Sequence, residues 1–207
     1  MSTPQYPDEA SLIVGLVQHQ DAAYRQAIKA YQGSMLHLAR SFVGDRFADE
    51  IVQDAWLAVM KSLPGFEGRA SLKTWILRIV ANESKSRLRR ENRMTSLDAM
   101  TAADPGLQDH FDGRGHWQGP LAKWQAASPE ELLSTEQMAD CLNSTIKQLP
   151  ELQAATLSLK EQQGLAFSDI CNILQVSESN VRVLLHRARL KLYSTIEHFQ
   201  LTGECRG

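Results

Sequence analysis

Two groups of cationic side chains are the residues of this chain whose types and spacing indicate a chemistry. The first lies between Glu178 and Glu197, where arginines recur with no acidic residue among them. On a helix of 3.6 residues per turn, one side of this segment is apolar. The outward and flanking positions are Ser179, Asn180, Arg182, Val183, His186, Arg187 and Arg189. A basic face without carboxylates can approach a phosphate backbone, so the predicted chemistry is nucleic-acid binding.

The second group lies near residue 85. Arg78, Asn82, Lys85 and Arg89 are spaced i, i+4, i+7 and i+11, which aligns them along one line of a helix. A row of cations with an amide among them suits contact with a nucleic-acid backbone. Arg87 and Arg90 fall away from this line and are expected to be solvated.

A third polar stripe is acidic. Glu50, Gln53 and Asp54 lie at i, i+3 and i+4, opposite an apolar side that contains Ile51, Val52, Ala55, Trp56 and Val59. Two interpretations of this stripe remain open at this point: an ordinary solvated face, or a contact with a partner. Trp56 and Trp75 are each expected to be core aromatics, with base stacking as the alternative.

The elements that position these side chains are all predicted to be helices. Apolar residues recur at helical spacing from 9 to 45, 46 to 63, 71 to 93, 136 to 149 and 150 to 163, and no strand-like alternation appears. Gly44, Pro64 and Gly164 mark helix ends, and Ser71 opens a helix. The fold class is therefore all-α, with two helical domains.

The segment from Phe167 to Leu192 has the outline of a helix-turn-helix. A short apolar-periodic segment ends at Leu174, a break follows at Gln175 and Val176, and a second helix opens at Ser177 and extends to Leu192. An amphipathic helix with solvated arginines is the alternative. The turn favours DNA binding, because this motif presents its second helix to the major groove. His186 fits a base contact and a solvated position equally well.

The overall charge of the chain is close to neutral. The formal net charge is -2 and the pI is near 6.3, and 43% of residues are apolar. Residues 95 to 134 are rich in glycine and proline and are predicted to be a linker. Trp117 and Trp124 within it are expected to pack on a domain or a partner, since exposed tryptophan is unusual. His110 and His116 have no neighbouring cysteine or paired carboxylate, so no metal site is expected.

The cysteines and the N-terminal residues bear on the compartment. Cys141, Cys171 and Cys205 are far apart and odd in number, so they are expected to be reduced thiols, with Cys171 in the core. The N-terminal sequence lacks the pattern of a secretory signal, and no apolar run approaches the roughly 20 residues of a membrane span. We therefore expect a cytoplasmic protein without membrane insertion.

Three sequence blocks together resemble a known family. ADEIVQDAW (48 to 56), FEGRASLKTWILRIVAN (66 to 82) and SRLRRE (86 to 91) are similar to region 2 of the extracytoplasmic-function (ECF) group of sigma factors. SNVRVLLHRAR (179 to 189) is similar to the recognition helix of region 4. The resemblance implies a region 2 domain at 1 to 94, a linker at 95 to 134 and a region 4 domain at 135 to 200.

The resemblance also implies roles for individual residues. Glu50, Gln53 and Asp54 correspond to the contact with core RNA polymerase. Recognition and melting of the -10 element correspond to Glu67, Gly68, Arg69, Ser71, Trp75, Arg78, Asn82, Lys85 and Arg89. The -35 element corresponds to the outward and flanking positions of the helix that opens at Ser177, from Ser179 to Arg189.

The implied function is that of an ECF sigma factor, which directs core RNA polymerase to promoters and helps to melt DNA. The implied partners are the clamp helices and flap of the polymerase, promoter DNA and an anti-sigma factor, and no cofactor is implied. A free-standing helix-turn-helix regulator is the alternative, but it leaves the Glu50 stripe and the second basic row unexplained. An enzyme is not supported, because the sequence has no P-loop, GxSxG or HExxH motif.

Overall fold

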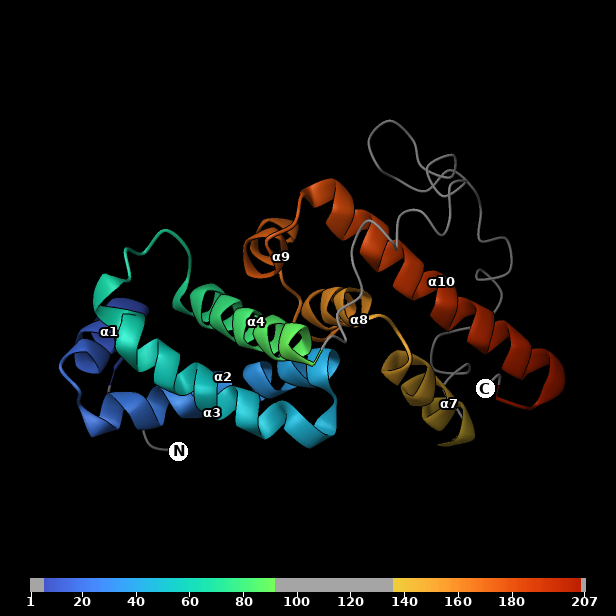
Figure 1. Ribbon diagram of the computed structural model, residues 1–207, viewed down its shortest axis with the longest axis horizontal. Coiled ribbons are helices and arrows are strands. Elements are labelled where there is room, and N and C mark those ends of the chain that lie inside the picture. The colour runs from blue at the N-terminus through green and yellow to red at the C-terminus, as the bar shows by residue number, and fades with distance from the viewer. Residues whose placement is uncertain (1–5, 92–135, 206–207) are drawn as a thin grey trace. The chain divides into compact units, whose positions relative to one another are not determined.

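A computed structural model describes residues 6–91 and 136–205. Within these ranges every regular element is helical, which confirms the all-α prediction (Figure 1). Two compact units form: Met1–Met94 with Ser158–Val176, and Thr95–Leu157 with Ser177–Gly207. The predicted linker from 95 to 134, with Trp117, Trp124, His110 and His116, lies outside the described residues.

Four helices account for the N-terminal part of the first unit. They are α1 (Glu9–Val17), α2 (Asp21–Val43), α3 (Asp45–Ser62) and α4 (Leu72–Arg90), and the short 3-10 turn η1 (Leu63–Gly65) follows α3. Gly44 separates α2 from α3 with a φ of 74°, a conformation that glycine adopts without steric cost. Ser71 caps α4, because its hydroxyl oxygen accepts the Thr74 N–H at 3.1 Å.

Helices α2, α3 and α4 pack against one another and enclose the core of this unit (Figure 1). On α4 the buried residues are Leu72, Thr74, Ile76, Leu77, Val80, Ala81, Ser84 and Leu88. Trp75, which was expected in the core, is only half-buried, and so is Ile79 one turn further along the helix. The difference arises because α4 contacts several helices, so its buried stripe is wider than the pattern predicted and is displaced toward Leu77.

The first unit also contains a segment from the C-terminal half of the chain. The π-helical turn η3 (Ser158–Gln162) contacts α2, and α9 (Phe167–Leu174) packs on α4. Ile170, Ile173 and Leu174 are fully buried, so this packing is apolar at its centre. Ala166 stands at the N-cap of α9 and supplies no side-chain cap, which costs about 1 kcal/mol relative to serine.

The second unit is built from α7 (Glu136–Lys147), α8 (Glu151–Leu157) and α10 (Glu178–Thr202), with α10 packed on the other two. The spacing predicts a buried side made of Val181, Leu184, Leu185, Ala188 and Leu192; the first four are buried, whereas Leu192 is half-buried. The predicted end of α10 at Leu192 was wrong, because the helix continues to Thr202. No glycine or proline interrupts the chain before Gly203, which ends the helix with a φ of 73°.

The predicted break between the last two helices is present. Gln175 has a left-handed backbone, with φ 58° and ψ 46°, and its N–H donates to the Cys171 carbonyl at 2.8 Å. Ser177 then caps α10 by accepting the Asn180 N–H at 3.3 Å. The residues expected to make the turn of a helix-turn-helix therefore do end one helix and begin another.

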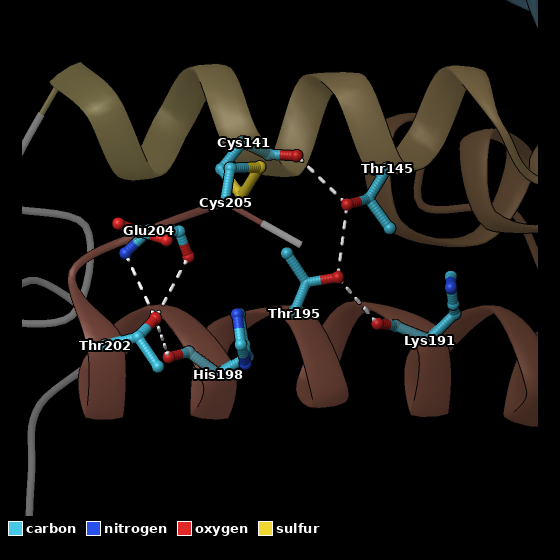
Figure 2. Close-up of a disulfide and its surroundings, with 8 residues drawn as sticks. All are labelled: Cys141, Thr145, Lys191, Thr195, His198, Thr202, Glu204 and Cys205. Carbon is cyan, nitrogen blue, oxygen red and sulfur yellow. Dashed lines mark hydrogen bonds between the residues drawn. A yellow bond between two sulfur atoms is a disulfide. The ribbon is translucent and has the colours of Figure 1, made fainter. Parts of the chain in front are cut away.

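The expectation of reduced cysteines was wrong for two of the three. Cys141 of α7 and Cys205 form a disulfide, although they are 64 positions apart (Figure 2). The prediction failed because the chain reverses after α10 and returns to α7, which the spacing of cysteines does not reveal. Cys171 lies outside this bridge and is half-buried, whereas a core position was expected.

Candidate functional site

The loop before α4 and the first turns of α4 enclose a cavity of about 310 Å³. The cavity lies within the first unit and is lined by Gly65, Phe66, Glu67, Arg69, Ala70, Thr74, Trp75, Arg78 and Asn172. Four residues that the sequence assigned to one site, Glu67, Arg69, Trp75 and Arg78, thus line one wall. Asn172 of α9 was missed, because nothing in the local sequence indicates that α9 packs beside this loop.

Trp75 forms an aromatic wall of the cavity. Its ring packs on Phe66 with centroids 5.1 Å apart and an interplanar angle of 56°. The indole is half-buried, so the side chain both packs on the domain and faces the cavity. Core packing and base stacking were posed as alternatives, and the position of Trp75 is compatible with both.

The remaining loop residues have definite local roles. Gly68 has a φ of 69°, which residues with a Cβ rarely adopt. Arg69 forms an ion pair with Glu67, and both side chains are largely exposed. Ser71 uses its hydroxyl to cap α4, and the hydroxyl of Thr74 donates to Asp169 of α9 at 3.1 Å. The loop is therefore fixed to α4, and α4 is tied to α9.

The row of cations on α4 is divided by its contact with α9. Arg78, Asn82 and Arg89 are exposed, whereas Lys85 is half-buried and its ammonium donates to the carbonyl of Leu174. Burial lowers the pKa of Lys85, and the nearby charge of Arg89 lowers it further. The last turn of a helix carries partial negative charge, so the end of α9 is a favourable place for this cation. Lys85, one member of the predicted row, is thus hydrogen-bonded within the protein.

The polar stripe on α3 is exposed at Glu50, Gln53 and Asp54. Glu50 pairs with Arg87 of α4 at 2.6 Å, and Arg87 also pairs with Glu91 at 2.8 Å and lies 4.1 Å from the Phe47 ring centroid. The expectation that Arg87 is merely solvated was wrong, since its side chain is only 18% exposed. Glu91 follows Arg87 by four positions, whereas Glu50 and Phe47 belong to α3, whose position beside α4 the local pattern could not predict.

Two apolar side chains extend the α3 stripe and were missed. Leu57 is 62% exposed and Met60 37% exposed. Leu57 follows Gln53 by four positions and Asp54 by three, so all three share one face of the helix. The sequence does contain a signal that could have identified them, namely an apolar residue on the polar side of an amphipathic helix.

On α10 the predicted nucleic-acid residues lie in the first three turns. Ser179 and Arg189 are exposed, and Asn180, Arg182, Val183, His186 and Arg187 are half-buried. Arg182 pairs with Glu178 of the preceding turn at 2.6 Å. That carboxylate partly neutralises the cation, so the basic character of the face is concentrated further along the helix.

Comparison with known proteins decides the family. A model of sigma-70 region 2 matches residues 27–94, and a model of sigma-70 region 4 matches residues 139–192. The RNA polymerase sigma-H factor of Pseudomonas aeruginosa is 30% identical over 168 residues, which cover 81% of this chain and 82% of that protein. This chain belongs to the sigma-70 family. It is an RNA polymerase sigma factor of the ECF group, and that family acts in transcription initiation without catalysis of its own.

Other sigma factors agree with this assignment. The ECF RNA polymerase sigma-E factor of Escherichia coli is 27% identical over 170 residues, covering 81% of this chain and 83% of the relative. The structure of CnrH in complex with the cytosolic domain of CnrY shares the fold, with a TM-score of 0.58 and 19% identity over 92% of this chain and 97% of that one. In this sigma factor, none of the helices within the described ranges is long and apolar enough to cross a membrane.

Proposed function

We propose that the two matched regions divide promoter recognition between them. Residues 1 to 94 bind core RNA polymerase and the -10 element, residues 95 to 134 act as a linker, and residues 135 to 200 bind the -35 element. The observation that carries the proposal is the cavity beside α4, where an aromatic wall, an arginine and a loop converge. The protein itself is not an enzyme, since the polymerase performs the chemistry.

The cavity suits a base taken out of the stack. Its volume of about 310 Å³ lies at the lower end of small-ligand pockets. Trp75 supplies a ring on which a base can stack, and Arg78 supplies a cation at the rim. Unpairing a base costs a few kcal/mol, which such a pocket can offset. Asn82, Lys85 and Arg89 continue along α4 as contacts for the displaced strand.

The α9 contact predicts that the free protein binds -10 DNA weakly. Asn172 occupies the cavity rim, Asp169 accepts from Thr74, and Lys85 is engaged at the end of α9. Asp169→Ala removes one of these ties, so we expect about fivefold tighter binding of a single-stranded -10 oligonucleotide, the equivalent of about 1 kcal/mol. Fluorescence anisotropy with the isolated protein measures this change.

The control for this measurement is Asp140→Ala, which removes an exposed carboxylate of α7. Both variants change the net charge equally, but Asp140 belongs to the second unit, so it controls for net charge alone. Asp169→Asn controls for the local charge, because it removes the same charge and keeps an amide oxygen that can accept from Thr74. An equal gain in affinity for Asp169→Ala and either control would show that charge alone is responsible and would remove α9 from the account.

The basic face of α10 predicts a loss of -35 binding in two variants. Arg182→Ala and Arg187→Ala are each expected to weaken binding of the holoenzyme by about 1 to 3 kcal/mol where the side chain reaches a base edge. Lys191→Ala, at an exposed position on the same helix, is the matched control. Competition between intact and altered -35 sequences separates the roles, because a loss that is uniform across sequences indicates a phosphate contact.

The proposed contacts with the polymerase are also divided between the two domains. We propose that the Glu50 stripe binds the clamp helices of the largest polymerase subunit and that the region 4 domain binds the flap. An anti-sigma factor is a further expected partner. One solved sigma factor that this chain resembles, RpoE of Bartonella quintana, is described in complex with the anti-sigma factor NepR, with 21% identity and a TM-score of 0.54. The proposed location is the cytoplasm, where the polymerase acts.

Run-off transcription tests the proposal as a whole. Core RNA polymerase with this protein is expected to produce discrete transcripts from genomic fragments, and mapped start sites should share -10 and -35 sequences. Tight, sequence-specific duplex binding without polymerase, together with no effect on transcription by core enzyme, would favour the free-standing regulator. The region 2 match, which that alternative leaves without a purpose, argues against it.

A further inference from the structure

The disulfide of the second unit joins a buried sulfur to an exposed residue. Cys141 lies on the inner face of α7 and is 2% exposed, whereas Cys205 follows α10 and is exposed. Cys205 lies beyond residue 192, where the match to region 4 ends, and so does the last part of α10. The bridge therefore connects the matched region to an extension that the family model does not cover.

The turn that carries Cys205 is held by hydrogen bonds as well as by sulfur (Figure 2). The Gly203 N–H donates to the Phe199 carbonyl at 2.7 Å. The Thr202 hydroxyl donates to the His198 carbonyl at 2.9 Å and accepts the Glu204 N–H at 3.1 Å. These contacts reverse the chain toward α7 and need no disulfide. Two reduced thiols would therefore stay near each other, at a high effective concentration.

Near the bridge, two threonine hydroxyls form a polar contact between α10 and α7. The hydroxyls of Thr145 and Thr195 lie 3.1 Å apart, and they also approach the carbonyls of Cys141 and Lys191, each at 3.0 Å. Three contacts share two hydroxyl hydrogens, so one contact lacks a hydrogen at any moment. The disulfide is consequently the strongest single connection between α7 and the end of α10.

We propose that Cys141 and Cys205 form a reversible redox staple that fixes the C-terminal half of α10 on α7. A disulfide in a cytoplasmic protein is usually transient or redox-sensing, so this inference rests on the proposed location. The oxidant that forms the bridge is a hydroperoxide, and the reductant that opens it is a dithiol protein of the thioredoxin class.

The chemistry balances in both directions. The exposed Cys205 thiolate attacks a hydroperoxide, which gives a sulfenic acid and releases water or an alcohol. The Cys141 thiol then attacks this sulfur, the S–S bond forms, and a second water leaves. In reduction, one thiolate of a dithiol attacks the sulfur of the exposed residue Cys205, and Cys141 departs as the thiolate. The second thiol of the dithiol then attacks this mixed disulfide, so Cys205 is released as a thiolate and the dithiol becomes a disulfide.

The staple acts on the helix that carries the predicted -35 residues. α10 is continuous from Glu178 to Thr202, and its second half packs on α7. In the oxidised form this half is anchored covalently, whereas in the reduced form it is held by noncovalent packing and the shared hydroxyl contacts. Local opening of this half is therefore expected to depend on redox state.

Thiol counting on the full chain tests the bridge. After hydrogen peroxide, denaturation and alkylation, the wild-type protein should carry one label, on Cys171, and after dithiothreitol it should carry three, since the sequence has 3 cysteines. Cys205→Ser should carry two labels in both conditions. The matched control Cys171→Ser should change from two labels to none. Three labels on peroxide-treated wild type, or a bridge that involves Cys171, would overturn the pairing.

Hydrogen exchange tests the mechanical consequence. Amides of residues 193–202 are expected to exchange about tenfold more slowly in the oxidised form than in the reduced form, and Cys205→Ser should show no redox dependence. Equal exchange in both forms of the wild type would refute the staple even with the bridge present. Neither assay uses polymerase or DNA, so failure here is distinct from failure of the proposed function.

Acid-quenched cells test reversibility where the protein works. Thiol labelling should find the reduced form in unstressed cells and the bridged form within minutes of peroxide, with recovery that requires the thioredoxin-class reductant. A complete bridge in unstressed cells would make it a constitutive disulfide and would contradict the switch.

Discussion

Asp54→Lys is expected to remove this sigma factor from core RNA polymerase. Asp54 is exposed on α3 beside Gln53 and Leu57, and truncation of a charge that is paired and buried in an interface typically costs 2 to 5 kcal/mol. Reversal of the charge adds repulsion, so we expect at least about a hundredfold loss of affinity, the equivalent of about 3 kcal/mol. Co-purification with core enzyme and a titration by fluorescence anisotropy measure this loss.

The structure determines which carboxylate gives the clearer test. Glu50 pairs with Arg87, so its reversal disturbs the contact of α3 with α4 as well as any interface. Asp21→Lys is the control for a reversed charge, because Asp21 is an exposed acid on a different helix, α2. Undiminished binding by Asp54→Lys, or an equal loss in Asp21→Lys, would refute the assignment of this face to the polymerase. Leu57→Ala should weaken binding without altering charge.

The second large effect is expected at Trp75, in promoter opening. Stacking of a base on an aromatic side chain is worth about 1 to 3 kcal/mol, so Trp75→Ala should reduce open-complex formation by about 5- to 150-fold. Trp75→Phe keeps a ring beside Phe66 and should retain part of the activity. Permanganate reactivity of -10 thymines reports strand opening, and run-off transcription reports the output.

A template with a pre-opened bubble distinguishes opening from assembly. The Trp75→Ala defect should be smaller on this template than on duplex DNA, because the cost of unpairing has been met in advance. Retention of polymerase binding and of the thermal unfolding temperature is the control for folding. An equal defect on both templates would contradict a role in melting and would indicate that Trp75 only supports the domain.

The sequence predicted well what depends on local pattern. Helical periodicity and the caps at Ser71 and Ser177 located α4 and α10, and the buried set from Val181 to Ala188 followed from spacing. Glu67 and Arg69 of the loop and Trp75 and Arg78 of α4 are close in the chain and line one cavity. Short sequence separation makes such a site predictable.

What the sequence missed depends on contacts between distant segments. Arg87 was expected to be exposed to solvent, because the local pattern does not reveal its partner Glu50, which lies 37 positions earlier in the chain. Asn172 joins the cavity, and Lys85 engages the Leu174 carbonyl, through packing of α9 on α4, across 89 positions in the second case. The disulfide spans 64 positions. None of these pairings has a local signature, since each is set by how whole helices pack.

The bond from Lys85 to the end of α9 makes two binding events thermodynamically linked. The ammonium donates to the Leu174 carbonyl, and in the proposed function it also contacts the displaced DNA strand, so on that assignment α9 and DNA compete for it. Any ligand that prefers α9 detached must raise the affinity for -10 DNA by some factor. Reciprocity then requires -10 DNA to raise the affinity for that ligand by the same factor. A single lysine thus gives the promoter a means of reporting its own opening to whatever binds α9.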